Sequence, residues 1–212
     1  MSSRRLTSTS YAILGLLATQ PWSTYELANQ LRRALHYFWP RAESNLYAEP
    51  KRLVAAGLAD AREEWTGDRK RTVYSITEAG RARLEEWLGT DVPPVRVESE
   101  AYLRILFGNM GSKDDVLRAL RRIEDDAVAM SRHYAQLGEE YARGEGPFPD
   151  RIHVNALLVS LAISQGRTTA AWARSARADV ERWDDTAAPN VDWAVKKLRD
   201  AVGEGETPSD AP

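Results

Sequence analysis

The stretch from residue 41 to residue 77 limits the possible folds more than any other part of the chain, because a helical pattern is followed at once by two strand patterns. From Ser44 to Gly57 the apolar side chains fall on one side of a helical wheel, and a glycine such as Gly57 typically ends a helix. Residues 58–65 and 72–76 are rich in strand-forming side chains. The six residues between them, TGDRKR, predict a turn that carries three adjacent cations.

Two further helices are predicted before this stretch, over residues 10–18 and 25–35. Ser23 or Thr24 caps the second of them, and Glu26, three residues after Ser23, completes a capping-box pattern. Three helices followed by a basic two-stranded hairpin outline a winged helix-turn-helix domain, a class of domain that reads double-stranded DNA.

The third helix and the hairpin tip carry the candidate DNA-binding side chains. Arg and Asn pair with purine edges, whereas Ser, Tyr and Lys more often hold phosphates. Adjacent cations at a hairpin tip repel one another, and an anionic partner relieves that repulsion. The alternative interpretation of both sets is a solvated surface that contributes only solubility. The candidates are Ser44, Asn45, Tyr47, Lys51 and Arg52 on the helix and Arg69, Lys70 and Arg71 at the tip.

The formal net charge of −2 is unevenly distributed along the chain. Residues 1–90 hold 13 Lys and Arg against 10 Asp and Glu, whereas the remaining residues hold 16 against 21. The basic excess therefore lies in the part of the chain for which DNA binding is predicted, and the acidic excess lies elsewhere.

Several classes of function are disfavoured by residue usage. The chain has no cysteine, which removes disulfides and thiolate chemistry and favours a cytoplasmic setting. His36, His133 and His153 are far apart in the sequence, and no metal-binding, nucleophile or phosphate-loop motif is present. The apolar run at residues 11–18 is too short to span a bilayer. We therefore expect no enzyme activity, cofactor, metal or membrane partner.

A Pro-containing connector at residues 92–98 follows a fourth predicted helix and marks a domain boundary. The predicted organisation is a winged-helix DNA-binding domain at residues 1–90, a helical dimerisation and effector domain at residues 91–202, and a disordered polar tail at residues 203–212.

Residues 116–141 form a heptad pattern, in which apolar residues recur at steps of four and three, and this predicts coiled-coil-like packing. A second long helix is expected at residues 151–183. Leu157, Leu158 and Leu161 widen its apolar band, so we expect this helix to contact more than one neighbour. The pattern leaves open whether the helix that pairs with residues 116–141 belongs to the same subunit.

Short motifs also recur in a fixed order in the first part of the chain. They are YAILGLL at residues 11–17, YELA at 25–28, FWP at 38–40, LY at 46–47, KRL at 51–53, AGL at 56–58 and VYxITxxG at 73–80. Together these motifs resemble the PadR family of bacterial transcription regulators. Two positions depart from the family pattern: Thr24 stands where the family usually has Gly, and Pro50 stands where it commonly has an aliphatic residue. We expect Pro50 to bend the third helix or to split it at Glu49.

The resemblance implies a mainly α-helical protein, with an N-terminal winged helix-turn-helix followed by an all-helical, antiparallel coiled-coil-like dimerisation domain. The implied function is that of a homodimeric transcription regulator, a repressor, that binds a pseudo-palindromic operator and is released by a small aromatic or hydrophobic effector. The rival hypothesis is a protein-interaction module whose winged helix does not bind DNA, and Pro50 and the slight overall acidity are its support.

Aromatic residues near the dimer centre hold flat hydrophobic effectors in some proteins of this family. The aromatic side chains of this chain that could serve in the same way are more simply interpreted as core residues. They are Trp87, Tyr102, Phe107, Trp172 and Trp183.

Overall fold

The computed structural model describes residues 6–39, 46–66, 69–187 and 191–203. The chain divides into two compact units, Met1–Val95 and Arg96–Pro212. Among the described residues, no helix combines the length and the apolar character that a membrane crossing requires.

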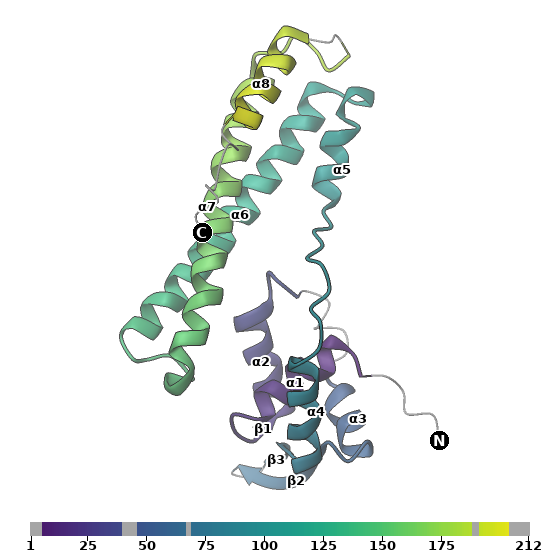
Figure 1. Cartoon of the computed structure of the whole chain (residues 1–212), viewed down its shortest axis with the longest axis vertical. Helices are drawn as coiled ribbons and strands as arrows, with labels where there is room; N and C mark the ends of the chain where they lie inside the picture. Colours follow the sequence, from purple (N-terminus) through teal and green to yellow (C-terminus); the bar gives the residue numbers. More distant parts are fainter. Residues whose placement is uncertain (1–5, 40–45, 67–68, 188–190, 204–212) are drawn as a thin grey trace, which may run out of the picture. The chain divides into compact units, whose positions relative to one another are not determined.

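The N-terminal unit is a three-helix domain with a small sheet and one additional helix (Figure 1). The sheet is antiparallel with the order β1-β3-β2, so that the β2–β3 hairpin forms the wing. This arrangement confirms the predicted winged helix-turn-helix. Its elements are α1 (Ser8–Leu17), β1 (Trp22–Ser23), α2 (Thr24–Leu35), α3 (Glu49–Ala55), β2 (Ala59–Thr66), β3 (Arg69–Ile76) and α4 (Glu78–Leu88).

Side-chain caps fix where the helices of this unit begin. Ser23 caps α2, and its Oγ accepts a hydrogen bond from the Glu26 backbone N–H at 3.3 Å. The Glu26 carboxylate in turn accepts the Ser23 backbone N–H at 2.8 Å, which completes the predicted capping box. Thr7 and Ser10 form a second capping box at the start of α1.

The third helix is shorter than the sequence pattern predicts. It begins at Glu49 rather than near residue 44, and Pro50 lies in its first turn. A proline at that position removes a backbone N–H that would have no partner within the helix. Pro50 therefore begins the helix instead of bending or splitting it. Gly57, with a φ of 72°, follows the helix in the left-handed conformation expected of a C-terminal glycine.

The second wing strand is longer than predicted, whereas the first keeps its predicted length and is shifted by one residue. The structure pairs residues 59–66 with residues 69–76 in antiparallel register, so the three cations from Arg69 to Arg71 lie in β3 and not in a turn. The sequence also gave no indication of β1, a two-residue strand in which Trp22 pairs with Tyr74. Short strands of this kind depend on a partner far away in the sequence and have no local pattern.

The C-terminal unit is entirely helical in its described part (Figure 1). Of the predicted polar tail, only Gly203 is described, as the last residue of α8, and residues 204–212 lie outside the described part. The elements are α5 (Glu100–Leu106), the 3-10 helix η2 (Gly108–Met110), α6 (Lys113–Ala142), the 3-10 helix η3 (Pro149–Arg151), α7 (Ile152–Glu181) and α8 (Val191–Gly203).

The heptad seam of α6 packs against α7 of the same chain, and the two helices run antiparallel. The start of α6 lies at the end of α7, where the Lys113 ammonium donates a hydrogen bond to the Glu181 carbonyl oxygen at 2.8 Å. Glu124 forms an ion pair with Arg174 at 3.0 Å further along the pair. The buried seam residues of α6 are Val116, Leu120, Ile123, Ala127, Tyr134 and Leu137.

A second apolar face of α7 stays exposed within the described structure. Leu157 is 72% exposed, Leu161 is 49% exposed, and Leu158 is also exposed. These are the residues that widen the apolar band in the sequence. An apolar face of this size on a helix that is already packed indicates a surface available to a further partner.

Candidate nucleic-acid interface

The recognition-helix candidates are only partly covered by the structure. Ser44 and Asn45 lie outside the described residues. Tyr47 lies in the turn before α3 and is exposed, and Lys51 and Arg52 are exposed on α3 itself. The opposite side of this region holds the apolar residues Leu46, Pro50 and Leu53, which are buried. The structure thus presents two neighbouring cations on the outer face of α3.

Arg52 is joined to a carboxylate that the sequence interpretation did not consider. Its Nη1 donates a hydrogen bond to Glu49 Oε2 at 2.6 Å. Glu49 is 2% exposed, and its other oxygen, Oε1, accepts a hydrogen bond from the hydroxyl of Ser10 on α1. The exposed cation on α3 is therefore connected to the interior of the domain.

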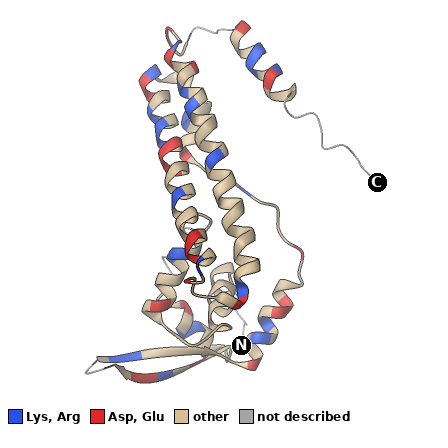
Figure 2. Ribbon diagram, turned by 90° about the vertical axis from the view of Figure 1, so that its left-hand side faces the viewer, with Lys and Arg blue, Asp and Glu red and all other residues tan. Residues whose placement is uncertain are grey.

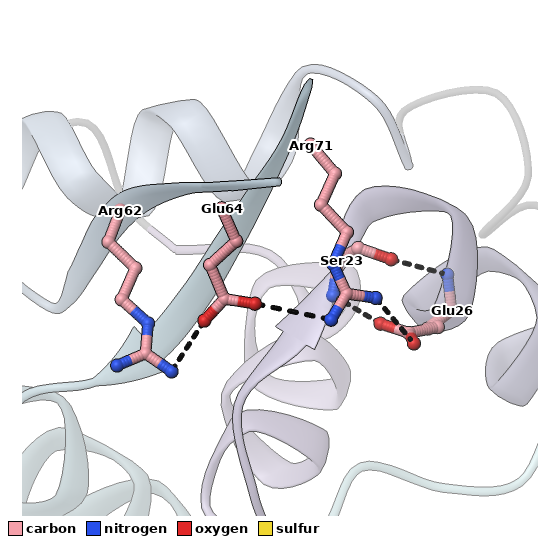
Figure 3. A network of polar contacts seen from close by, with 5 residues as sticks. All are labelled: Ser23, Glu26, Arg62, Glu64 and Arg71. Carbon is pink, nitrogen blue, oxygen red and sulfur yellow. Dashed lines mark hydrogen bonds and ion pairs between the residues drawn. The ribbon is translucent and has the colours of Figure 1, made fainter. Parts of the chain in front are cut away.

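The cations Lys70 and Arg71 of the wing are paired with acidic side chains. The Lys70 ammonium lies 2.6 Å from the Glu63 carboxylate. Arg71 bridges the wing and α2, because its Nη2 lies 3.2 Å from Glu64 Oε2 on β2 and its Nη1 lies 3.3 Å from Glu26 Oε1 (Figure 3). Arg69 pairs through its backbone position with Thr66 in the β2–β3 register.

The Arg71 contact reaches the carboxylate that caps α2. Hydrogen bonds from the Ser23 hydroxyl and backbone N–H, together with the positive charge of Arg71, lower the pKa of the Glu26 carboxyl below its usual value. Glu26 is therefore ionised at neutral pH, and a single carboxylate both caps the helix and anchors the wing. Arg62 joins the same network through an ion pair with Glu64 at 2.6 Å (Figure 3).

The wing as a whole carries opposite charges in balance. Residues 59–76 contain four Lys and Arg and four Asp and Glu. Figure 2 shows basic positions along one strand of the extended hairpin, and acidic positions together with a basic one along the other. A nucleic-acid backbone must therefore compete with the carboxylates of the wing for its cations.

The predicted aromatic set is not brought together. Trp87 belongs to the N-terminal unit, where it stacks on Tyr11 with ring centroids 4.6 Å apart. Tyr102 and Phe107 are exposed in the helical unit and do not line its cavity. Trp172 and Trp183 do line a cavity of about 420 Å³ between α5, α6, α7 and α8.

Trp193 on α8 completes the aromatic lining of this cavity. Its ring meets that of Trp183 edge to face, with centroids 5.3 Å apart. The polar edge of the cavity contains Asp179 and Lys197, which form an ion pair at 2.9 Å. The indole N–H of Trp183 is buried and has no hydrogen-bond partner among the described residues. The cavity is therefore lined by apolar rings with one ion pair at its edge.

The sequence interpretation assigned no part in these sites to Glu26, Glu49, Glu64 and Trp193. The i, i+3 spacing of Glu49 and Arg52 is a detectable signal for their ion pair. The pairing of Glu64 with Arg71 requires the strand register, and the cavity position of Trp193 requires the packing of α8. Neither of these is visible in a local pattern.

A helix-turn-helix followed by a β-hairpin, with cations on the outer face of the third helix, defines the winged-helix class of DNA-binding domains. Residues 13–86 match the model of the "Transcriptional regulator PadR-like family". Residues 13–86 therefore form a PadR-like domain, which confirms the resemblance seen in the sequence motifs.

A curated relative agrees with the family match. The chain is 32% identical over 99 residues to the negative transcriptional regulator PadR of Bacillus subtilis (strain 168). The matched region is 46% of this chain and 54% of that protein, so the chain spans about half the length of this curated relative.

Two solved structures share the fold over most of the chain. One is Bacillus subtilis PadR in complex with operator DNA, with a TM-score of 0.69, 23% sequence identity and coverage of 82% of this chain and 99% of that chain. The other is Bacillus subtilis PadR in complex with p-coumaric acid, with a TM-score of 0.62, 24% identity and coverage of 84% and 100%. At these identities the likeness concerns the fold, and it extends through the helical unit.

Proposed function

We propose that this protein is a sequence-specific, DNA-binding transcription regulator and acts as a repressor. The observation that carries the proposal is the pair of exposed cations, Lys51 and Arg52, on the outer face of the third helix of a PadR-like domain. The Bacillus subtilis relative is a negative transcriptional regulator, and this supports the assignment as a repressor. We assign the DNA contacts to the eight candidates named from the sequence, and we expect the protein to act in the cytoplasm, where the DNA is.

We propose that the protein acts as a homodimer formed by the helical part, residues 91–202, while residues 1–90 read DNA. The exposed apolar face of α7, with Leu157 and Leu161, supports a partner helix there. A two-fold dimer reads a pseudo-palindrome whose half-sites lie about one helical turn, roughly 34 Å, apart.

The test of DNA binding is fluorescence anisotropy with a labelled duplex that covers the DNA upstream of the protein's own gene, at two salt concentrations. We expect tight binding that weakens steeply with salt, because each phosphate contact releases counterions. The double variant Lys51→Ala with Arg69→Ala should lose this binding. Arg122→Ala with Lys196→Ala removes two exposed cations from the helical unit and serves as the matched control.

If binding to the upstream duplex equals binding to a scrambled duplex and neither depends on salt, the DNA-binding proposal is wrong. A protein-interaction module is then the better description, since an apolar helical interface is nearly insensitive to salt.

We also propose that the cavity between α5, α6, α7 and α8 receives a small aromatic effector that weakens DNA binding. Its support is the aromatic lining from Trp172, Trp183 and Trp193, with the ion pair of Asp179 and Lys197 at the polar edge. Since the fold neighbour from Bacillus subtilis was solved with p-coumaric acid, that compound is the first probe.

Calorimetric titration of p-coumaric acid into the protein tests the effector site. We expect binding that is lost in Trp172→Ala and kept in Tyr102→Ala, because Trp172 lines the cavity and Tyr102 does not. Binding that survives Trp172→Ala, or binding that leaves DNA affinity unchanged, would contradict the role proposed for this cavity.

A further inference from the structure

A buried carboxylate lies directly behind the outer face of the recognition helix. Glu49 is the first residue of α3 and is 2% exposed, yet it carries an ionisable group. A buried charge is costly unless it is paired and hydrogen-bonded. Its two oxygens have different partners, the hydroxyl of Ser10 on α1 and the guanidinium of Arg52 on α3.

The hydrogen bonds around Ser10 fix the direction in which its hydroxyl points. Ser10 Oγ accepts a hydrogen bond from the Thr7 backbone N–H at 2.9 Å and lies 3.0 Å from Thr7 Oγ1. The Ser10 hydroxyl has one proton, and it donates that proton to Glu49 Oε1. Thr7 therefore supplies the donors to Ser10. The N-terminal cap of α1 thus holds Glu49 in place.

The ion pair of Arg52 differs from the other ion pairs of the winged-helix unit in how firmly the carboxylate is held. The side chains of Glu26, Glu63, Glu64 and Glu86, which pair with the other cations, are 29% to 65% exposed. An exposed carboxylate can rotate away together with its cation, and such pairs add little order. The Glu49 carboxylate is held inside the domain, so it fixes one end of Arg52 while the side chain of Arg52 remains 42% exposed.

We propose that Glu49 is a positioning residue for DNA recognition, and that it holds the guanidinium of Arg52 in one orientation toward a base edge. Glu49 engages Nη1 of Arg52, whose side chain is 42% exposed, and other N–H groups of the planar guanidinium would then donate to a purine acceptor pair. Fixing a long side chain before binding reduces the conformational entropy that is lost when the complex forms. The proposal rests on the proposed DNA-binding function, and it assigns to Glu49 the selection of one base pair rather than general affinity.

The experiment is a double-mutant cycle on DNA affinity with the full-length chain. The probe is a duplex enriched from a random library by the wild-type protein, compared with a scrambled duplex. Glu49→Leu removes the charge but fills the same buried space, so we expect thermal unfolding to change little. We expect its preference for the enriched duplex over the scrambled one to fall about tenfold, the range of one specific base contact.

The coupling to Arg52 separates a positioning role from a structural one. In an Arg52→Ala background, Glu49→Leu should change the preference less than about twofold, because the group that it positions is gone. Glu49→Gln, which keeps the side-chain shape, provides the same cycle if the leucine variant does not fold. Glu86→Gln breaks the exposed i, i+3 pair with Arg83 on α4 and is the matched control, for which we expect no change in preference.

The outcomes distinguish the two proposals. A tenfold loss in both backgrounds means that Glu49 acts through the fold of the domain, and the positioning role is overturned while DNA binding stands. An unchanged preference in Glu49→Leu overturns it as well. If selection enriches no sequence at all, the DNA-binding function itself is wrong, and the positioning role is lost with it.

Discussion

The two units hold their helices together by different means. In the winged-helix unit, α1 and α3 are joined through the buried carboxylate of Glu49, and the wing is joined to α2 through Arg71. In the helical unit, α6 and α7 are joined by close packing, with Gly166 of α7 against the backbone of α6. Directional polar contacts determine where a few side chains point, whereas close packing determines how far apart two long helices lie. Directional polar contacts suit the recognition of DNA, and close packing suits a helical spacer.

A glycine-to-alanine substitution made in each unit gives the largest expected difference in stability between the two units. A Cβ at Gly166 would lie 2.8 Å from the Ala127 carbonyl oxygen and 2.8 Å from Ser131 Cβ, so α6 and α7 would have to separate. We expect Gly166→Ala to destabilise the helical unit by about 1–3 kcal/mol. A Cβ at Gly15 in α1 would meet no atom within 4 Å, so we expect Gly15→Ala to stabilise by about 0.5–1 kcal/mol.

Urea unfolding followed by circular dichroism measures both effects. If Gly15→Ala and Gly166→Ala shift stability in the same direction, the contrast between polar positioning and close packing does not hold for these two helices.

Removing a carboxylate should change DNA affinity in the winged-helix unit and stability in the helical unit. Glu63→Gln leaves Lys70 without its partner on the wing, so the competition with phosphate disappears, and we expect DNA affinity to rise about threefold with a steeper salt dependence. In the helical unit, Glu124→Gln removes the partner of Arg174 and Arg177 between α6 and α7. We expect this control to lower stability and to leave DNA affinity unchanged. Anisotropy titrations at several salt concentrations test the prediction, and an unchanged affinity for Glu63→Gln would show that Lys70 does not contact DNA.

The smallest expected effect is the acid sensitivity of the α2 cap. The Ser23 hydrogen bonds and Arg71 lower the pKa of Glu26 in the folded state, so its stabilising contribution is fully present above the unfolded-state pKa. That contribution is lost as the pH falls through the lowered folded-state pKa, in the range below about pH 4.5. We expect at most about 1 kcal/mol, because the groups are partly exposed. Thermal unfolding between pH 3 and pH 7 should show a shallower pH dependence for Glu26→Gln than for the wild type, and equal slopes would contradict this assignment.

The features that sequence patterns predicted well are those with short-range causes. The capping box at Ser23 needs only a residue three positions away, and Gly57 ends α3 through its own backbone freedom. The heptad seam of α6 repeats often enough to identify its buried face. The family motifs gave the order of the helices and the wing, and with it the outline of the site.

The features that were not predicted depend on partners distant in the sequence. Glu49 belongs to the site because Ser10, 39 residues earlier, lies against it. Arg71 was expected to contact phosphate from a turn, but the strand register places it beside Glu64, and the packing of the wing places it beside Glu26. A local pattern identifies a cation, but it does not identify the carboxylate that the fold brings to it.

The junction between the wing and α4 also restricts which sequences can carry this site. A Cβ at Gly80 would lie 2.1 Å from the Leu58 carbonyl oxygen, directly after the turn that ends α3. The Thr77 backbone N–H and hydroxyl donate hydrogen bonds to the carbonyl oxygens of Leu58 and Gly57 at 3.2 Å and 2.8 Å. Residue 80 therefore cannot acquire a side chain during sequence divergence unless the backbone that follows the recognition helix moves as well. Two positions more than twenty residues apart in the chain are thus constrained to evolve together.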